Sequence, residues 1–163
     1  MGIAVGDPAP DFTLAGVDGR TGEPGSWTLS ALAGHPVVLA FYPADNTPVC
    51  TAQLEEYTRE IGSFDALDAT VLVISPQSPE SHRAFAAGRN GFAFPLLSDE
   101  DRAVGRVYGV LGLLDLYRRS TFVVGPDGRV SWVHRYVGPG LRYRPADELV
   151  AAVRAASSAG TSG

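Results

Sequence analysis

The chain contains a single cysteine, Cys50, and its neighbours in the sequence give that thiol a chemical setting. An apolar run at residues 36–42 precedes it, and a helical pattern that opens with Thr47 and Pro48 contains it. We therefore expect Cys50 at a strand-to-helix junction, in the first turn of the helix. The unpaired N–H groups and the dipole of such a turn stabilise a thiolate. The position indicates redox chemistry on one sulfur.

A free cysteine is most often a small buried hydrophobic residue, and that alternative applies here as well. The local pattern favours chemistry, because Thr47 suits an N-cap, Pro48 the first helical position and Cys50 the third. Lowering the pKa of a thiol from about 8.5 to about 6 takes roughly 3–4 kcal/mol. A helix terminus contributes at most about 2 kcal/mol. A cation is therefore needed nearby, and we expect an arginine, because lysine is absent and the three histidines carry no motif.

Composition narrows the class of protein. The 163 residues, 45% of them hydrophobic, suit one globular domain, expected at residues 1–156 and followed by a flexible tail at 157–163. The net charge of −5 and the lack of a basic stripe argue against nucleic-acid binding. No apolar run approaches the length of a membrane span, and no secretory signal is visible. The histidines have no metal-ligand spacing, so we expect neither metal nor cofactor. A lone cysteine favours a reducing cytoplasm.

The elements that must position Cys50 can be read from hydrophobic patterns. Residues 36–42 and 70–75 are apolar throughout, which is typical of strands buried on both faces, and residues 94–97 predict a short strand. Turn residues between apolar segments predict two hairpins, at 12–14 with 27–29 around Asp18-Gly19, and at 120–125 with 129–136 around Pro126-Asp127-Gly128.

Four helices follow from periodic apolar positions. The first begins near Pro48 and turns Cys50 inward. Ser98, with Asp101 three residues later, predicts the N-cap of a helix that runs to about residue 108. The remaining two are expected at 79–89 and 145–156. The order of elements predicts an α/β fold, with a mixed central β-sheet, helices on both faces and an N-terminal β-hairpin extension.

The pattern Pro43-x-x-x-Thr47-x-x-Cys50 resembles the peroxidatic signature of peroxiredoxins. Its longer form at 41–51, Phe-Tyr-Pro-Ala-Asp-Asn-Thr-Pro-Val-Cys-Thr, is similar to the bacterioferritin-comigratory protein, or PrxQ, branch. Residues 5–14 resemble the family's opening, and residues 119–124 resemble the segment that brings its second catalytic arginine beneath the cysteine. The resemblance covers roughly residues 3–155 and implies a thioredoxin-like fold.

The resemblance implies a thiol-dependent peroxidase that reduces hydrogen peroxide or organic hydroperoxides through a sulfenic acid on Cys50. Arg119 and the backbone N–H groups of Val49 and Cys50 would stabilise the departing oxygen, and the Thr47 hydroxyl would orient the peroxide. Pro43 would shield the sulfur, and Val49, in place of the family's glycine, would narrow the pocket mouth. The plainer alternatives are a simple helix cap for Thr47 and a solvated charge for Arg119. The adjacent Arg118 is expected to point to the opposite face.

Two departures from the family concern the reductant and the arginine. The branch often has a second cysteine five residues after the first, where this chain has Glu55. We therefore expect a one-cysteine mechanism with an external thiol, either thioredoxin, a glutaredoxin-like protein or a low-molecular-weight thiol. Gln53 stands where many members have Glu, which would weaken a network with the arginine. A thiol–disulfide oxidoreductase would need Cys-x-x-Cys, and position 53 of this chain is Gln. A peroxide sensor stays open as an alternative function. Both a monomer and a homodimer stay open as the oligomeric state.

Overall fold

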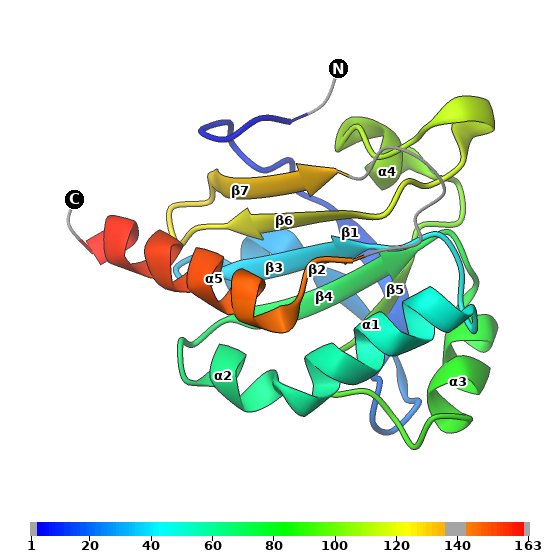
Figure 1. Ribbon diagram of the computed structural model, residues 1–163. Helices are drawn as coiled ribbons and strands as arrows, with labels where there is room; N and C mark the ends of the chain where they lie inside the picture. The colour runs from blue at the N-terminus through cyan, green and yellow to red at the C-terminus, as the bar shows by residue number, and fades with distance from the viewer. Residues whose placement is uncertain (1–2, 136–142, 162–163) are drawn as a thin grey trace.

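The computed structural model describes residues 3–135 and 143–161, in which seven strands form one mixed sheet (Figure 1). The strands are β1 (Thr13–Val17), β2 (Pro24–Thr28), β3 (Val37–Phe41), β4 (Thr70–Ser75), β5 (Leu96–Ser98), β6 (Ser120–Val124) and β7 (Val130–Arg135). Their order across the sheet is β2-β1-β5-β4-β3-β6-β7. Strands β3, β4 and β5 are parallel, and the outer pairs are antiparallel. The predicted mixed sheet and both predicted hairpins are confirmed.

Helices cover both faces of this sheet. They are α1 (Pro48–Arg59), α2 (Ile61–Asp65), α3 (Pro79–Ala87), α4 (Ala103–Val107) and α5 (Ala146–Thr161). Helices α1, α2, α3 and α5 lie together on one side of the sheet in Figure 1. Val104 of α4 packs against the hydrophobic cluster of the other face. None of the helices in the described residues is long and apolar enough to cross a lipid bilayer.

Strand β3 is apolar throughout because it contributes to two hydrophobic clusters. Val38 and Ala40 belong to the cluster that packs with α1, whereas Leu39 and Phe41 belong to the cluster on the opposite face. Side chains alternate across a strand, so a strand covered on both faces favours apolar residues at every position. The strand ends at the loop that leads into α1, which places that loop at the edge of the buried sheet.

The start of the helix predicted from Ser98 is wrong. Ser98 is the last residue of β5, where it pairs with Ser75, and α4 begins only at Ala103. The buried carboxylate of Asp99 accepts hydrogen bonds from the N–H groups of Val104 at 3.1 Å and Gly105 at 2.8 Å. Pairing with the neighbouring strand holds Ser98 in extended backbone, and Asp99 takes over as the acceptor for the first turn of α4.

The last helix extends further than the sequence predicted. Helix α5 begins at Ala146, one residue after the expected start, and continues to Thr161 instead of ending at residue 156. Residues 157–161 of the expected tail are therefore helical, because the Ala-rich body carries the helical hydrogen bonds forward. Residues 162 and 163 lie outside the described part of the chain.

Candidate active site

Cys50 occupies the first turn of α1 and is fully buried. Thr47 is the N-cap in extended backbone, and Pro48 is the first helical residue. The first helical hydrogen bond runs from the N–H of Thr51 to the carbonyl of Thr47 at 2.8 Å. The N–H groups of Val49 and Cys50 precede that bond, so they have no acceptor within the helix. The turn therefore presents donors beside a buried thiol, which is 0% exposed.

Thr47 differs from the expected cap in one detail. Its side chain makes no capping hydrogen bond, and its hydroxyl donates instead to the carbonyl of Ala44 at 3.5 Å. That distance is at the outer limit of a hydrogen bond, so the hydroxyl is held only weakly. A weakly held hydroxyl remains able to turn toward another oxygen. Thr47, Pro43 and Val49 are all half-buried within the loop and first turn that lead to Cys50.

Arg119 lies directly against the thiol. Its Nη2 donates to Sγ of Cys50 at 3.0 Å, and its side chain is buried with 2% exposure. The contact follows from strand register, because Phe41 at the end of β3 pairs with Ser120 at the start of β6. Arg119 therefore enters beneath the loop that follows β3. The preceding Arg118 is exposed, as the alternation of side chains predicted.

Gln53 accepts a hydrogen bond from Nη1 of Arg119 and is itself buried. Its Nε2 lies 3.4 Å from the hydroxyl of Tyr57, which donates to the carbonyl of Arg144 at 2.6 Å. Burial raises the pKa of Tyr57, so this phenol remains protonated and able to donate. An amide oxygen thus serves as the acceptor for the arginine, at the position where the resemblance implied a carboxylate.

A second polar cluster beside the site was missed by sequence reasoning. Asp45, in the loop before α1, accepts hydrogen bonds from the hydroxyls of Tyr42 at 2.6 Å and Ser81 at 2.7 Å. Nδ1 of His82 lies 2.8 Å from the same carboxylate. Burial, followed by the charge of Asp45, raises the pKa of Tyr42 well above its ordinary value. The available signal was the spacing of His82 and Phe85, which puts both on the inward face of one helix.

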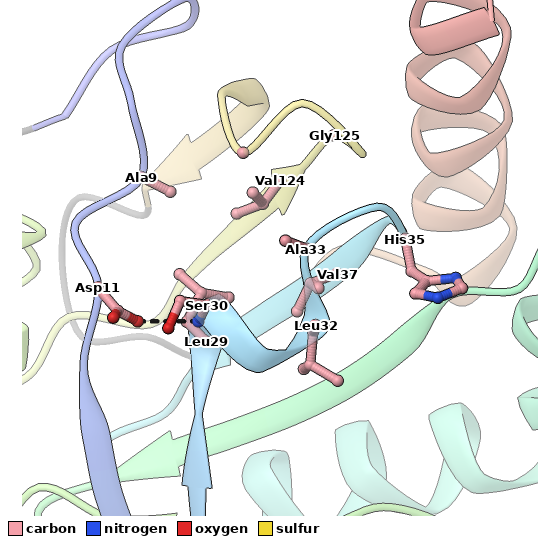
Figure 2. A pocket seen from close by; sticks show the side chains of 11 residues that line it. Ala9, Asp11, Leu29, Ser30, Leu32, Ala33, His35, Val37, Val124 and Gly125 are labelled. Atoms are coloured by element: carbon pink, nitrogen blue, oxygen red, sulfur yellow. Dashed lines mark hydrogen bonds between the residues drawn. The ribbon is translucent and has the colours of Figure 1, made fainter.

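Figure 2 shows a pocket of about 170 Å³. This pocket lies away from the site, at the opposite end of the sheet. It is bordered by Val37 and Val124, the pair at the far end of β3 from Phe41. A five-residue strand spans about 13 Å between its first and last residues. Asp11 at its rim accepts a hydrogen bond from the N–H of Ser30 at 2.8 Å, and bonding to Ser30 lowers the pKa of Asp11. The pocket is therefore separate from the thiol.

Within residues 3–135 and 143–161, no group of three or more His, Cys, Asp or Glu side chains is arranged to hold a metal ion. The candidate site consists of a buried thiol, a guanidinium in contact with it, and the N–H groups of a helix start. Such a site favours negative charge on sulfur and on an oxygen atom bound beside it. This arrangement suits nucleophilic attack by a thiolate.

Known proteins are similar to this chain in both sequence and fold. The AhpC/TSA family matches residues 5–133. A protein of Mycobacterium tuberculosis named as a peroxiredoxin is 39% identical over 135 residues, which are 78% of this chain and 82% of the relative. Peroxiredoxin Bcp of Xanthomonas campestris is 38% identical over the same coverage of both chains.

A solved structure of a related protein is also similar to this chain. The bacterioferritin comigratory protein of Xanthomonas campestris, whose structure is described in terms of alkyl peroxide reduction activity, superimposes with a TM-score of 0.76. It is 30% identical to this chain, and the match covers 93% of this chain and 98% of that protein. The similarity therefore extends over nearly the whole of both molecules.

Proposed function

The chain belongs to the AhpC/TSA family and is a peroxiredoxin, a thiol-dependent peroxidase, and we propose that Cys50 is its peroxidatic residue. The observation that carries this assignment is the 3.0 Å contact between Nη2 of Arg119 and Sγ of Cys50. A buried guanidinium in contact with sulfur favours the thiolate, which is the nucleophilic form of cysteine. Cys50 is the single cysteine of the chain, so no other thiol competes for the role.

In the first step, the Cys50 thiolate attacks one oxygen of the hydroperoxide. A sulfur–oxygen bond forms, the oxygen–oxygen bond breaks, and the electron pair of that bond leaves with the distal oxygen. Sulfur is oxidised to a sulfenic acid, and the peroxide is reduced to an alkoxide or hydroxide that takes a proton to become an alcohol or water. Negative charge moves from sulfur to the departing oxygen, so fixed donors at both positions lower the barrier.

Arg119 is proposed to donate both to the sulfur, where the negative charge begins, and to the departing oxygen, where it ends. The backbone N–H groups of Val49 and Cys50 are proposed to stabilise the departing oxygen, because the helix itself does not use them. The Thr47 hydroxyl is proposed to orient the peroxide, which its loose bond to Ala44 permits. Pro43, half-buried in the same loop, is proposed to shield the sulfur from water.

An external thiol must complete the cycle. The sulfenic acid reacts with a second thiol to give a mixed disulfide and water, and a further thiol then releases the Cys50 thiolate and a disulfide product. Position 55 is Glu and no second cysteine exists in the chain, so the second thiol comes from another molecule. Thioredoxin, a glutaredoxin-like protein and a low-molecular-weight thiol are the proposed classes of reductant.

We propose hydrogen peroxide and alkyl hydroperoxides as substrates. The Xanthomonas bacterioferritin comigratory protein is described in terms of alkyl peroxide reduction, and Val49 adds an apolar side chain beside Cys50 here. The cytoplasm is the proposed compartment, because its thiol pool can return the sulfenic acid to the thiolate. A monomer and a homodimer both agree with the proposed chemistry, and sedimentation analysis distinguishes them.

Stopped-flow oxidation by hydrogen peroxide tests the proposal. The wild type should react far faster than a free thiol, and Cys50→Ser should abolish the reaction. Arg119→Ala should slow it by about 100-fold or more, because it removes a fixed donor from the transition state. Arg118→Ala, the exposed neighbour, is the matched control and should leave the rate unchanged. A wild-type rate equal to that of a free thiol would exclude Cys50 as the peroxidatic residue.

A further inference from the structure

A buried carboxylate holds the middle of the loop between β3 and α1. Asp45 lies two residues after Pro43 and two before Thr47, and its side chain is 3% exposed. It accepts hydrogen bonds from the hydroxyls of Tyr42 and Ser81. A carboxylate buried without partners would be very costly, so each of these bonds contributes to holding the loop in place. The loop is therefore anchored at its midpoint.

The anchor continues through His82, which is 0% exposed. Nδ1 of His82 lies 2.8 Å from Oδ2 of Asp45, and Nε2 lies 3.0 Å from the carbonyl oxygen of Leu97. A carbonyl oxygen can only accept, so Nε2 carries a hydrogen and donates it. The pair then shares one proton between Nδ1 and the carboxylate. Through it, the loop is tied both to α3, which contains His82, and to β5, which contains Leu97.

We propose that Asp45 and His82 are positioning residues of the peroxidase site, a role that rests on the proposed function of Cys50. They act through the loop rather than on the peroxide. By holding its midpoint against α3 and β5, the pair fixes the position of the loop that contains Pro43 and Thr47. A shift of this loop by about 1 Å would misplace the Thr47 hydroxyl, and displacements of that size can cost about 100-fold in rate.

The pair is expected to affect the two halves of the cycle in opposite directions. Attack on a sulfenic acid occurs in line with the sulfur–oxygen bond, from the side opposite the departing oxygen. That oxygen arrives from the substrate side, so the second thiol must approach from the side that the protein covers. Cys50 is 0% exposed, and the side from which this thiol must approach becomes accessible only when the loop or first turn opens. An anchor that favours the closed loop therefore assists oxidation and opposes reduction.

The test measures both half-reactions in Asp45→Asn and His82→Gln. Oxidation by hydrogen peroxide should slow by about 10- to 100-fold. The reaction of the sulfenic acid with 5-thio-2-nitrobenzoate, followed by its absorbance, should become faster. A parallel loss in both half-reactions would indicate general damage and overturn the proposal. Rates within twofold of the wild type in both would overturn it as well.

The chain offers a matched control pair on its surface. Nδ1 of His35 lies 2.8 Å from Oδ2 of Asp68, with side chains 51% and 82% exposed. Asp68→Asn should change neither half-reaction, since this pair is exposed and belongs neither to the loop nor to its anchor. If Asp45→Asn fails to fold by circular dichroism, Ser81→Ala provides the test. It removes one donor to Asp45 and should change the two rates in the same opposite directions, to a smaller extent.

A double variant and the wild-type rate separate the remaining explanations. Asp45→Asn combined with His82→Gln should slow oxidation little more than either change alone, because the two side chains act as one unit. Additive losses would overturn a shared role. A wild-type protein that oxidises no faster than a free thiol would contradict the proposed function itself. A fast wild type with unaffected variants would contradict only the positioning role.

Discussion

At the scale of single residues, the proposed reactivity of the Cys50 thiol depends most on Arg119. The first turn of α1 contributes about 0.3–1 kcal/mol to a charge at its N-terminus, and up to about 2 kcal/mol in good geometry. A buried guanidinium 3.0 Å from sulfur adds an interaction that solvent screens poorly. Its orientation depends on Gln53, which accepts from Nη1 and leaves Nη2 directed at the sulfur.

Replacing Gln53 by Met tests this dependence. Methionine has a similar length but offers Nη1 of Arg119 no equivalent acceptor, so this buried hydrogen bond is lost. We expect the free energy of unfolding to fall by about 1–3 kcal/mol and peroxide oxidation to slow by about tenfold. Urea unfolding and stopped-flow kinetics measure the two effects. Gln77→Met, at a half-buried position outside the site, is the control, and an equal loss there would contradict the role of Gln53.

At the scale of elements, one carboxylate joins the helix that contains Cys50 to the last helix. Glu56 of α1 accepts a hydrogen bond from the N–H of Ala146 at 2.6 Å, at the first residue of α5. Its other oxygen accepts from the hydroxyl of Tyr143 at 2.9 Å. An acceptor with negative charge at a helix start satisfies an unpaired N–H and interacts favourably with the helix dipole. Helix α1 thereby helps to begin α5.

Glu56→Ala should therefore destabilise the protein although the residue lies outside the site. We expect a loss of about 1–2 kcal/mol in the free energy of unfolding, typical of a removed helix cap. Glu55→Ala removes a neighbouring carboxylate of the same helix and should change stability by less than about 0.5 kcal/mol. Urea denaturation of both variants is the measurement. Equal losses in the two variants would show that Glu56 has no special role.

At the scale of the whole molecule, buried phenols join the sheet to the segments around it. The hydroxyl of Tyr108 donates to the carbonyl of Pro10 at 2.6 Å, and that of Tyr117 donates to Asp99. On the opposite face, Tyr57 reaches the segment before α5. Burial raises the pKa of Tyr57, Tyr108 and Tyr117. The folded protein thus requires these phenols in their protonated form.

A loss of stability at alkaline pH follows. The pKa of each phenol is raised in the folded state above its ordinary value of 10.0, so the contribution to stability is present below pH 10 and is lost as the pH rises further. Urea unfolding between pH 8 and 11.5, with phenolate absorbance recorded in parallel, should show stability falling above pH 10. Tyr108→Phe should reduce the slope of that fall. A slope that does not differ from the wild type would contradict the role of Tyr108.

Local patterns were sufficient for most elements of the fold. The continuous apolar run of β3, the turn at Pro126-Asp127-Gly128 and the Thr47-Pro48 helix start each depend on neighbours within a few residues. The wrong start of α4 occurred where a distant contact overrode a local preference. Ser98 matched an N-cap, but its pairing with Ser75 in the neighbouring strand holds it in the sheet. Strand pairing satisfies two backbone groups at once, which a side-chain cap cannot match.

The sequence by itself determined that one thiol stands at a helix start and that it needs a cation. It singled out Arg119 only through resemblance to a family. The tertiary structure decided which groups meet that thiol, because Arg119 is 69 residues from Cys50, and His82 is 37 residues from Asp45. The physical reason is that helix periodicity and turn chemistry act over a few residues. The order and register of strands depend on burying both faces of the sheet at once, and no local pattern encodes that requirement.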